Sequence, residues 1–354
     1  MSRFFSAKYD ALTPYVPGEQ PGERQYVKLN TNENPFPPSP EALRYAAEHT
    51  RSQELYSDPE GVELRAALAR TYGVRPEETV LVNGSDEVLN FAFMAFCDES
   101  RPALFPDITY GFYPVFAQLN RVPYEELPLR EDFTLDPADY RDREGTLFIA
   151  NPNAPTGILL PPAEIEALLR ARRDRLVVVD EAYVDFGGES CVPLIHDYDN
   201  LLVIQTFSKS RSMAGARLGF GIACESLIRD LNTIRYSTNP YNVNSMTLAL
   251  GLGTLLDPEY TKRNCAEIVR VREETAERLR ALGFTLTESR ANFLFARSKR
   301  IGGEALYRRL KDRGILVRHF DKPRIRDYNR ITVGTPAQME ALLTAIQSIL
   351  EETT

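Results

Sequence analysis

The segment Leu201-Leu-Val-Ile-Gln-Thr-Phe-Ser-Lys-Ser-Arg-Ser-Met-Ala-Gly-Ala-Arg-Leu-Gly-Phe-Gly-Ile-Ala223 decides the fold prediction. Its apolar runs at 201–205 and 218–223 predict two buried strands that enclose a polar loop. That loop carries Lys209, hydroxyl side chains on both sides of it, and a second cation, Arg217. A lysine at the end of a buried strand can act as a nucleophile if its surroundings keep it a free amine.

The same loop has the groups that bind an anion. The hydroxyls of Thr206 and Ser208 can donate hydrogen bonds, and the planar guanidinium of Arg217 suits a phosphate. An amine and an anion site in one loop match a cofactor that carries both an aldehyde and a phosphate, as pyridoxal 5'-phosphate does. A loop rich in Ser, Arg and Lys is also typical of a solvated turn, so the rest of the chain has to discriminate between the two.

Size and composition describe a globular protein of about two domains. The chain has 354 residues, 43% of them hydrophobic and 26% charged, and a formal net charge of −8. The acidic balance disfavours nucleic acid as the main partner. No apolar run reaches the ~18 residues that span a membrane, and no signal peptide is evident at the start. The cytoplasm is therefore the expected compartment.

Cysteine and histidine usage predicts no metal site. The four cysteines are far apart in sequence and lack metal-ligand spacing, and there are only three histidines. We expect free thiols in a reducing compartment.

Short apolar strands alternate with helices through the first two thirds of the chain. Strands are expected at 79–82, 103–105, 145–150, 175–180, 201–205 and 218–223, with helices at 62–72, 88–96, 110–119 and 161–172. This alternation predicts an α/β fold with a mainly parallel sheet between layers of helices. Ligands of such sheets bind beyond the carboxyl ends of the strands, where Ser85, Asn153, Asp180 and Lys209 all fall.

Two further turns at this sheet edge suggest a site. In Asn83-Gly-Ser-Asp-Glu87, a strand runs into a helix, so free amides beside Gly84, Ser85 and Asp86 can bind an anion. We assign that contact to the amides and Ser85 rather than to carboxylates; a simple capped turn is the alternative.

Asp180 ends a Val-rich strand and needs a cation or donors, which a protonated pyridine nitrogen would supply. Tyr183 could donate to an oxygen on the same ring. The alternative is that Asp180 caps a helix and Tyr183 is an ordinary core tyrosine.

The chain divides into three parts. Residues 1–40 contain seven prolines and form an arm that packs on the small domain or on a partner. Residues 41–256 form the large domain. Residues 257–354 form a smaller α+β domain, opened by a long charged helix at 258–282. Within it, Arg318 and Arg330 occur at strand ends, where they suit an acidic substrate or simply lie on the surface.

The assembled motifs resemble the fold-type I pyridoxal-phosphate aminotransferases, and within them the histidinol-phosphate aminotransferases. The resemblance runs from Lys28 to the C-terminus. It rests on Leu29-Asn-Thr-Asn-Glu-Asn-Pro35, Tyr56-Ser-Asp-Pro59, Asn83-Gly-Ser-Asp-Glu87, Tyr110-Gly-Phe-Tyr113, Pro155-Thr-Gly157, Asp180-Glu-Ala-Tyr183, Ser208-Lys-Ser210 with Arg217, and Arg330-Ile-Thr-Val-Gly334.

The resemblance implies a role for each matching residue. Lys209 would attach the cofactor and shuttle a proton, Asp180 would pair with the ring nitrogen, Tyr183 would bond the ring hydroxyl, and Tyr110 would stack on the ring. Gly84, Ser85, Asp86, Thr206, Ser208 and Arg217 would surround the phosphate, which Tyr56 of a second subunit would also reach in an obligate homodimer. Asn32, Tyr110, Arg318 and Arg330 would contact the substrate.

One position departs from the family pattern. Family members often have Asn immediately before Pro-Thr-Gly, where it bonds the ring hydroxyl, but this chain has Ala154 there and Asn153 one residue earlier. Either Asn153 takes over that contact or Tyr183 makes it alone.

The leading hypothesis is transfer of the amino group of L-histidinol phosphate to 2-oxoglutarate. Alternatives on the same scaffold are an aromatic or broad-specificity aminotransferase and a threonine-phosphate decarboxylase. A transcription regulator with an aminotransferase-like sensor would need an N-terminal DNA-binding module, for which the Pro-rich first 40 residues leave no room. A protein with a dead site is disfavoured by Asp180, Tyr183 and Lys209.

Overall fold

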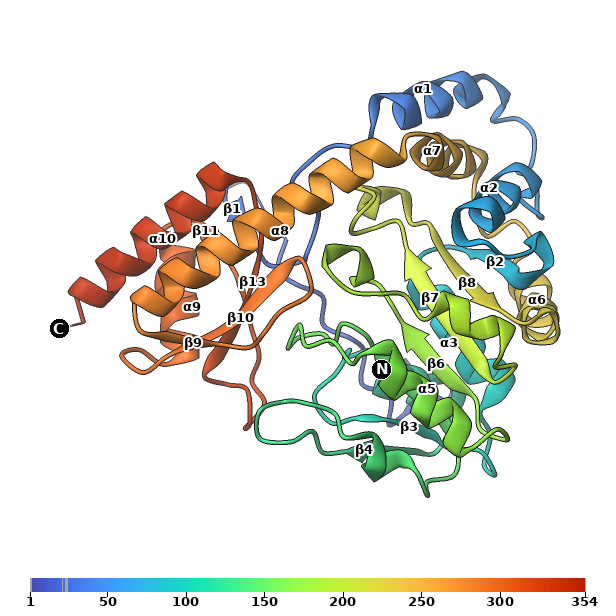
Figure 1. Ribbon diagram of the computed structural model, residues 1–354, viewed down its shortest axis with the longest axis horizontal. Coiled ribbons are helices and arrows are strands. Elements are labelled where there is room, and N and C mark those ends of the chain that lie inside the picture. The colour runs from blue at the N-terminus through green and yellow to red at the C-terminus, as the bar shows by residue number, and fades with distance from the viewer. Residues whose placement is uncertain (1, 21, 23–24, 354) are drawn as a thin grey trace.

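The computed structural model describes residues 2–20, 22 and 25–353 of the chain. Its largest feature is a seven-stranded sheet in the order β2-β8-β7-β6-β5-β3-β4 (Figure 1). Strand β8 is antiparallel to β7 and β2, and the other pairings are parallel. The strands are β2 (Thr79–Val82), β3 (Ala103–Pro106), β4 (Tyr124–Leu127), β5 (Thr146–Ala150), β6 (Val177–Asp180), β7 (Leu201–Thr206) and β8 (Gly219–Ala223).

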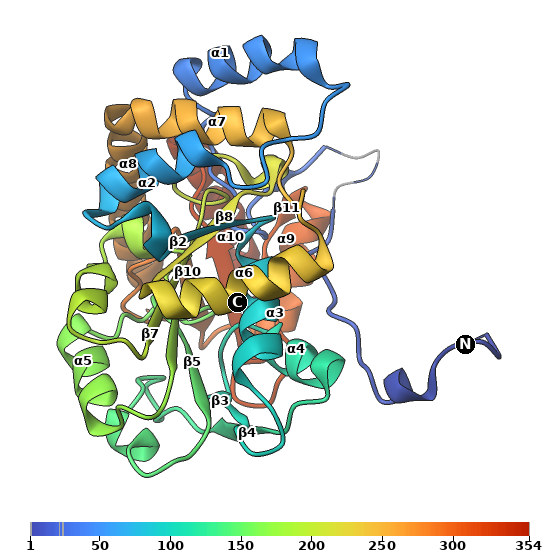
Figure 2. The ribbon, with the colours of Figure 1, turned by 90° about the vertical axis from the view of Figure 1, so that its right-hand side faces the viewer.

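Helices cover both faces of this sheet, so every residue of the central strands β5, β6 and β7 is buried. One face packs on α2 (Val62–Tyr72), α5 (Pro162–Ala171) and α7 (Ser245–Leu256), and α1 (Pro40–Glu48) lies on α7. The other face packs on α3 (Ser85–Phe96), α4 (Tyr113–Asn120) and α6 (Glu225–Thr238). Figure 2 shows the sheet between α5 on one side and α3 and α4 on the other. The predicted α/β fold with a mainly parallel, helix-covered sheet is confirmed.

A second hydrophobic core lies under a smaller, antiparallel sheet of order β12-β13-β10-β9. Its strands are β9 (Phe284–Leu286), β10 (Phe293–Ser298), β12 (Arg318–His319) and β13 (Tyr328–Thr332). The helices are α8 (Pro258–Ala281), α9 (Gly303–Asp312) and α10 (Pro336–Glu351). Helix α8 runs from the end of α7 to this sheet (Figure 1). The expected α+β unit at the C-terminal end is therefore present.

The N-terminal arm is fixed by backbone hydrogen bonds rather than by helices. Its strand β1 (Val27–Lys28) pairs in parallel with β11 (Ile315–Leu316). Beyond β1, the carbonyl of Leu29 accepts from the amide of Thr332, and that of Asn32 accepts from the side chain of Asn292. The arm therefore reaches the junction between the two sheets as an ordered part of the structure.

The structure corrects several element boundaries. Helix α3 begins at Ser85, three residues earlier than expected, and α4 begins at Tyr113, which leaves Tyr110 in the preceding turn. Edge strand β4 escaped prediction because three of its four residues are exposed and two of them are charged. Helix α6 was also not predicted, although its buried residues Ile228, Leu231 and Arg235 have helical spacing. Within the described ranges, no helix combines the length and apolar character needed to cross a membrane.

Candidate active site

A cavity lies at the carboxyl edge of the large sheet, between that sheet, the arm and the small sheet. Parallel strands bring loops that are distant in sequence to one edge, which is why residues far apart in the chain meet here. The cavity is lined by most of the residues that the sequence singled out: Asn32, Ser85, Asp86, Tyr110, Asp180, Tyr183, Thr206, Ser208, Lys209, Arg217, Arg318 and Arg330.

Lys209 follows β7 and directs its amine toward the arm. Its Nζ donates to the carbonyl oxygen of Thr31 at 3.2 Å. Burial lowers the pKa of Lys209 to about 8, and the nearby guanidinium of Arg330 acts in the same direction. With this pKa, about a tenth of the amine is unprotonated at pH 7, far more than at the ordinary lysine pKa of about 10.4. The residue therefore meets the condition for a nucleophilic lysine.

Asp180 is a buried acid without a cationic partner among the described residues. Its carboxylate accepts from the amide of Ala182 at 3.2 Å and from the hydroxyl of Tyr113 at 3.5 Å, both weak contacts. Burial raises the pKa of Asp180 to about 7. Ionising the group at this position is costly unless a ligand supplies positive charge. A cationic ring nitrogen facing Asp180 would meet that need.

Tyr183 is held at the edge of the cavity by the arm. Its hydroxyl accepts a hydrogen bond from Asn32 Nδ2 at 3.0 Å, and its ring meets Phe293 edge-on with centroids 5.1 Å apart. Lys209 Nζ lies 5.8 Å from the centre of the Tyr183 ring. Burial raises the pKa of Tyr183, so the hydroxyl stays protonated and its own proton is free to be donated into the cavity.

An anion cradle lies at the start of α3. Gly84 precedes the helix with φ 75°, and Ser85 is the first helical residue, so its amide is one of those without an intrahelical acceptor. The backbone of Gly219 approaches so closely that a Cβ there would lie 2.5 Å from Ser85 N. The cradle therefore depends on close contact between the backbones of α3 and β8.

Hydroxyl and guanidinium groups complete this cradle. Thr206 Oγ1 donates to Ser208 Oγ at 3.0 Å, and Arg217 donates to the same oxygen at 3.3 Å. Asp86 also lies in this cradle, where it accepts from Arg217 at 3.3 Å and from the hydroxyl of Tyr110 at 2.7 Å. The Asp86 carboxylate balances the charge of Arg217.

Two arginines form the opposite wall of the cavity. Arg330 donates to the carbonyl oxygen of Asn30 at 3.0 Å, and its Nε is buried without a hydrogen-bond partner. Arg318 donates to the carbonyl oxygens of Pro17 and Val16 at 3.2 and 3.1 Å. Among the described residues, neither guanidinium forms an ion pair, so this wall carries positive charge that an anionic ligand can neutralise.

The structure does not bring Asn153 or Tyr56 into the cavity. The Asn153 amide is occupied by hydrogen bonds to Thr109 at 2.9 Å, Thr156 at 2.9 Å and the carbonyl oxygen of Ile108 at 3.0 Å. Of the two residues that the sequence leaves open for the ring hydroxyl, Asn153 and Tyr183, only Tyr183 lines the cavity. Tyr56 lies on the surface, 81% exposed, and its ring stacks on Tyr241 at 4.4 Å.

Sequence reasoning missed two contributions to the site. Tyr15 and Gly18 of the arm line the cavity, and the Tyr15 ring stacks on Phe112 at 4.1 Å. Nothing in the local pattern around Tyr15 distinguishes it from a mobile terminus. The second is Arg211, which is buried two residues after Lys209 and supports the loop. Its position next to Lys209 in sequence is a signal that could have identified it.

The residues present fit a cofactor with an aldehyde, a ring nitrogen and a phosphate. Lys209 supplies an amine of lowered pKa, Asp180 supplies a buried carboxylate without a cation, and Arg217 with the start of α3 supplies an anion cradle. In the part of the chain that the structure describes, no group of three or more His, Cys, Asp or Glu side chains could hold a metal ion.

Comparisons with known proteins agree with this reading. The family model for aminotransferase class I and II matches residues 24–346. Histidinol-phosphate aminotransferase 1 of Bradyrhizobium diazoefficiens is 48% identical over 350 residues, covering 99% of this chain and 100% of that protein. Histidinol-phosphate aminotransferase 1 of Bordetella parapertussis is 47% identical, with 99% of both chains covered.

The fold also matches solved structures. The structure of histidinol-phosphate aminotransferase from Sinorhizobium meliloti in complex with pyridoxal-5'-phosphate has a TM-score of 0.91 at 24% identity, covering 100% of this chain and 99% of that one. The full-length matches above 40% identity show that the chain belongs to the class I and II aminotransferases, and within them to the histidinol-phosphate aminotransferase family.

Proposed function

We propose that this protein is a pyridoxal-phosphate-dependent aminotransferase that moves the amino group of L-histidinol phosphate to 2-oxoglutarate, giving imidazole-acetol phosphate and glutamate. The observation that carries the proposal is the placing of Lys209, Asp180 and the Arg217 cradle around one cavity. The full-length relatives named as histidinol-phosphate aminotransferases support this choice of substrate.

Bound pyridoxal phosphate supplies an electron-withdrawing ring that stabilises negative charge on the substrate Cα. The residues of this chain would do the rest. Lys209 would hold the cofactor and then move the proton at the substrate Cα. Asp180 would keep the ring nitrogen protonated, and Tyr183 would donate to the ring oxygen. Ser85, Thr206, Ser208 and Arg217 would bind the phosphate, with Gly84 and Asp86 in the same turn and Tyr110 beside the ring.

The arginine wall supports an anionic substrate. Among the described residues, Arg318 and Arg330 donate hydrogen bonds only to carbonyl oxygens and form no ion pair, so binding an anion there would neutralise their charge. The phosphate of histidinol phosphate and a carboxylate of glutamate both meet this requirement. One wall could therefore serve both halves of a ping-pong reaction.

A homodimer that donates Tyr56 to the partner's site belongs to the same proposal. Large apolar side chains are exposed close together on α1, α2, α7 and the loops beside them: Leu43, Leu55, Tyr56, Val62, Tyr241, Met246 and Leu256. Exposed apolar side chains gathered in this way are typical of an interface between subunits. We place the enzyme in the cytoplasm, where its four free cysteines would stay reduced.

The direct test is a comparison of amino donors. The purified protein is loaded with pyridoxal phosphate and incubated with 2-oxoglutarate and either L-histidinol phosphate, phenylalanine or O-phospho-threonine. Glutamate formation is then measured as kcat/KM for each donor. We expect histidinol phosphate to exceed phenylalanine by at least about a hundredfold, which corresponds to ~3 kcal/mol of discrimination.

The other outcomes separate the alternatives. Equal use of phenylalanine would identify an aromatic or broad-specificity aminotransferase. Release of carbon dioxide from O-phospho-threonine, without glutamate, would identify a decarboxylase. A protein that binds no pyridoxal phosphate at all would overturn the whole proposal.

A further inference from the structure

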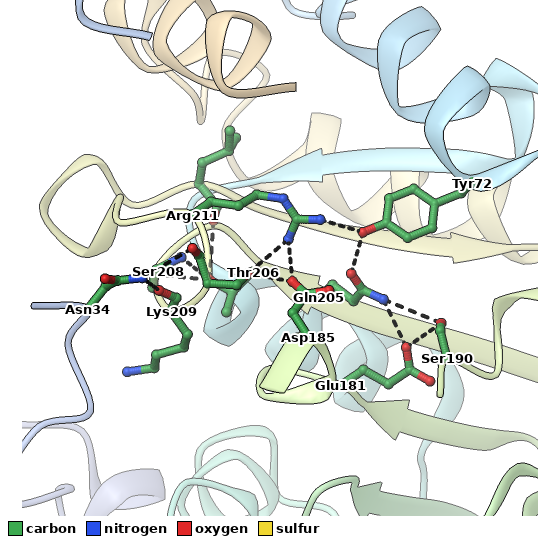
Figure 3. Close-up of polar contacts among 12 residues, drawn as sticks. Asn34, Tyr72, Glu181, Asp185, Ser190, Gln205, Thr206, Ser208, Lys209 and Arg211 are labelled. Atoms are coloured by element: carbon green, nitrogen blue, oxygen red, sulfur yellow. Dashed lines mark hydrogen bonds and ion pairs between the residues drawn. The ribbon is translucent and has the colours of Figure 1, made fainter. Parts of the chain in front are cut away.

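A buried chain of hydrogen bonds lies behind the Lys209 loop, on the side away from the lysine amine (Figure 3). We call it the Arg211–Glu181 chain, and it consists of Arg211, Tyr72, Gln205 and Glu181. Arg211 donates to the Tyr72 hydroxyl at 2.7 Å, and that hydroxyl donates to Gln205 Oε1 at 2.5 Å. Gln205 Nε2 then donates to Glu181 Oε2 at 2.9 Å.

This chain has one direction. It begins at a guanidinium, which can only donate, and ends at a carboxylate, which accepts when ionised. The Glu181 carboxylate also accepts from Ser190 Oγ and from the amide of Cys191, both at 2.6 Å. Every link therefore has a donor and an acceptor, and a network satisfied in this way is rigid.

The other terminal nitrogen of Arg211 bonds side chains next to Lys209. It donates to Asp185 Oδ2 at 3.1 Å and to Ser210 Oγ at 3.3 Å, and the Ser210 hydroxyl bonds the same Asp185 carboxylate. The guanidinium also lies 5.0 Å from the centre of the Phe207 ring. Arg211 thus holds the residues on both sides of Lys209.

The arm holds the same loop from its other side. Asn34 Nδ2 donates to the carbonyl oxygens of Lys209 at 3.0 Å and Ser210 at 3.2 Å. In Figure 3, the Lys209 side chain and the Arg211 side chain leave the loop in different directions. Arg211 is buried and does not line the cavity, so it acts on a ligand only through the loop.

We propose that Arg211 is a positioning residue for Lys209. Through Tyr72 on one side and Asp185 with Ser210 on the other, it fixes the backbone from which the lysine amine reaches the cavity. The chain also connects that backbone to Glu181, the residue after Asp180. The Lys209 amine and the Asp180 carboxylate therefore keep a constant separation. This inference rests on the proposed function for its kinetic consequence, but not for its effect on the lysine itself.

The shape of arginine, and not its charge alone, fulfils this role. The two terminal guanidinium nitrogens bond partners that lie on different sides of the side chain, whereas a lysine ammonium is a single point. Arg211→Lys therefore keeps the positive charge beside Asp185 and loses one side of the fork. Tyr72→Phe keeps the ring and removes the hydroxyl that joins Arg211 to Gln205.

The test measures Lys209 directly in the full chain without added cofactor. Wild type, Arg211→Lys and Tyr72→Phe are treated with an amine-acylating ester across a range of pH, and labelling of Lys209 is compared by mass spectrometry with that of the exposed Lys262. We expect both variants to change the pH profile of the Lys209 to Lys262 ratio. In the loaded enzyme, we expect Arg211→Lys to lower kcat about tenfold to a hundredfold with little change in KM, because a small misplacement of a reacting group has effects of that size.

Two further variants separate positioning from general stability. Tyr140→Phe removes another buried hydroxyl of the same core, one that has no hydrogen-bond partner among the described residues, so it should change neither readout. In the double variant Arg211→Lys with Tyr72→Phe, the effects on kcat should be less than additive, because both changes break one chain.

A lower melting temperature in Arg211→Lys and Tyr72→Phe, with wild-type labelling profiles and wild-type kcat for the folded protein, would overturn the proposal. If the wild type shows no transamination, the proposed function fails, while the labelling profiles still decide whether Arg211 positions Lys209.

Discussion

Asn32 of the arm donates from its Nδ2 to the hydroxyl of Tyr183 at 3.0 Å, across 151 positions of sequence. Asn32 is buried in the left-handed region with φ 57°, a conformation that asparagine tolerates better than most residues. The Thr332 hydroxyl donates to Asn32 Oδ1 at 2.9 Å, and the same Thr332 oxygen accepts from the backbone N–H of Asn32. One arm residue therefore connects the large sheet to the small one at the cavity.

Replacing Asn32 by Asp tests this connection. The change keeps the shape but removes the donor to Tyr183, and it adds a negative charge that raises the pKa of the tyrosine further. We expect about a tenfold loss of kcat, because the tyrosine hydroxyl would donate to the new carboxylate instead of into the cavity. We also expect ~1–3 kcal/mol of lost stability, because the new charge is buried without a cationic partner. Steady-state kinetics and urea unfolding measure the two effects. Wild-type values for both would show that the arm does not support Tyr183.

Asp180→Asn should stabilise the cofactor-free protein while it abolishes function. The folded-state pKa of Asp180, about 7, exceeds that of ~4 in an unfolded chain. Between these values the folded protein binds a proton that the unfolded chain has lost, so the free energy of unfolding falls as pH rises from 4 to 7. The variant lacks this penalty. We expect it to be more stable than wild type at pH 8 by ~2–4 kcal/mol, with a smaller gain at pH 5.

Glu181→Gln is the matched control for Asp180→Asn. Burial raises the pKa of Glu181 to about 7 as well, but its carboxylate accepts three hydrogen bonds of 2.6–2.9 Å. An amide cannot accept all of the hydrogen bonds that the ionised carboxylate accepts above pH 7, so at pH 8 this variant should gain much less stability over wild type than Asp180→Asn gains. Urea unfolding of wild type and both variants at pH 5 and pH 8 measures these free energies. An equal change in the free energy of unfolding for Asp180→Asn and Glu181→Gln would contradict this prediction.

Arg217→Lys should weaken cofactor binding through the phosphate. The guanidinium fork bonds Ser208 and Asp86 at the cradle, and an ammonium cannot reproduce that geometry. We expect Kd for pyridoxal phosphate, measured by fluorescence, to rise about tenfold to a hundredfold. Pyridoxal, which lacks the phosphate, provides the control and should bind both proteins alike. An equal loss of affinity for pyridoxal would place Arg217 elsewhere.

Ala154→Asn restores the residue that the family often has before Pro-Thr-Gly. Ala154 lines the cavity beside Tyr183, and Asn153 is occupied by other partners, so the new amide would add a donor that the chain now lacks. One added hydrogen bond of ~1 kcal/mol should move the pH at which the bound cofactor changes colour by less than about one unit. A spectrophotometric titration measures the shift. An unchanged midpoint would mean that the ring hydroxyl is already satisfied.

The sequence predicted the fold and most of the cavity because both depend on local patterns. The strands that end at Asp180 and Thr206 are apolar runs, and parallel strands bring their carboxyl ends to one edge. The contact of Asn32 with Tyr183 could not be predicted in the same way, because it depends on where a Pro-rich arm packs. The Arg211–Glu181 chain was not predicted because its members are common polar residues of helix α2, strand β7 and the loops after β6 and β7. The sequence left open whether Asn153 reaches the ring hydroxyl, because neighbouring residues of a turn can point in opposite directions; in the structure its side chain bonds Thr109, Thr156 and Ile108.

The most direct test of the account is to find which lysine holds the cofactor. The protein is loaded with pyridoxal phosphate, reduced with borohydride, digested, and analysed by mass spectrometry. The cavity geometry and the lowered pKa of Lys209 predict that the cofactor is trapped on that residue. Lys209→Ala should then bind pyridoxal phosphate without trapping it and should not transfer amino groups. Trapping on another lysine, or full transamination by Lys209→Ala, would contradict the account.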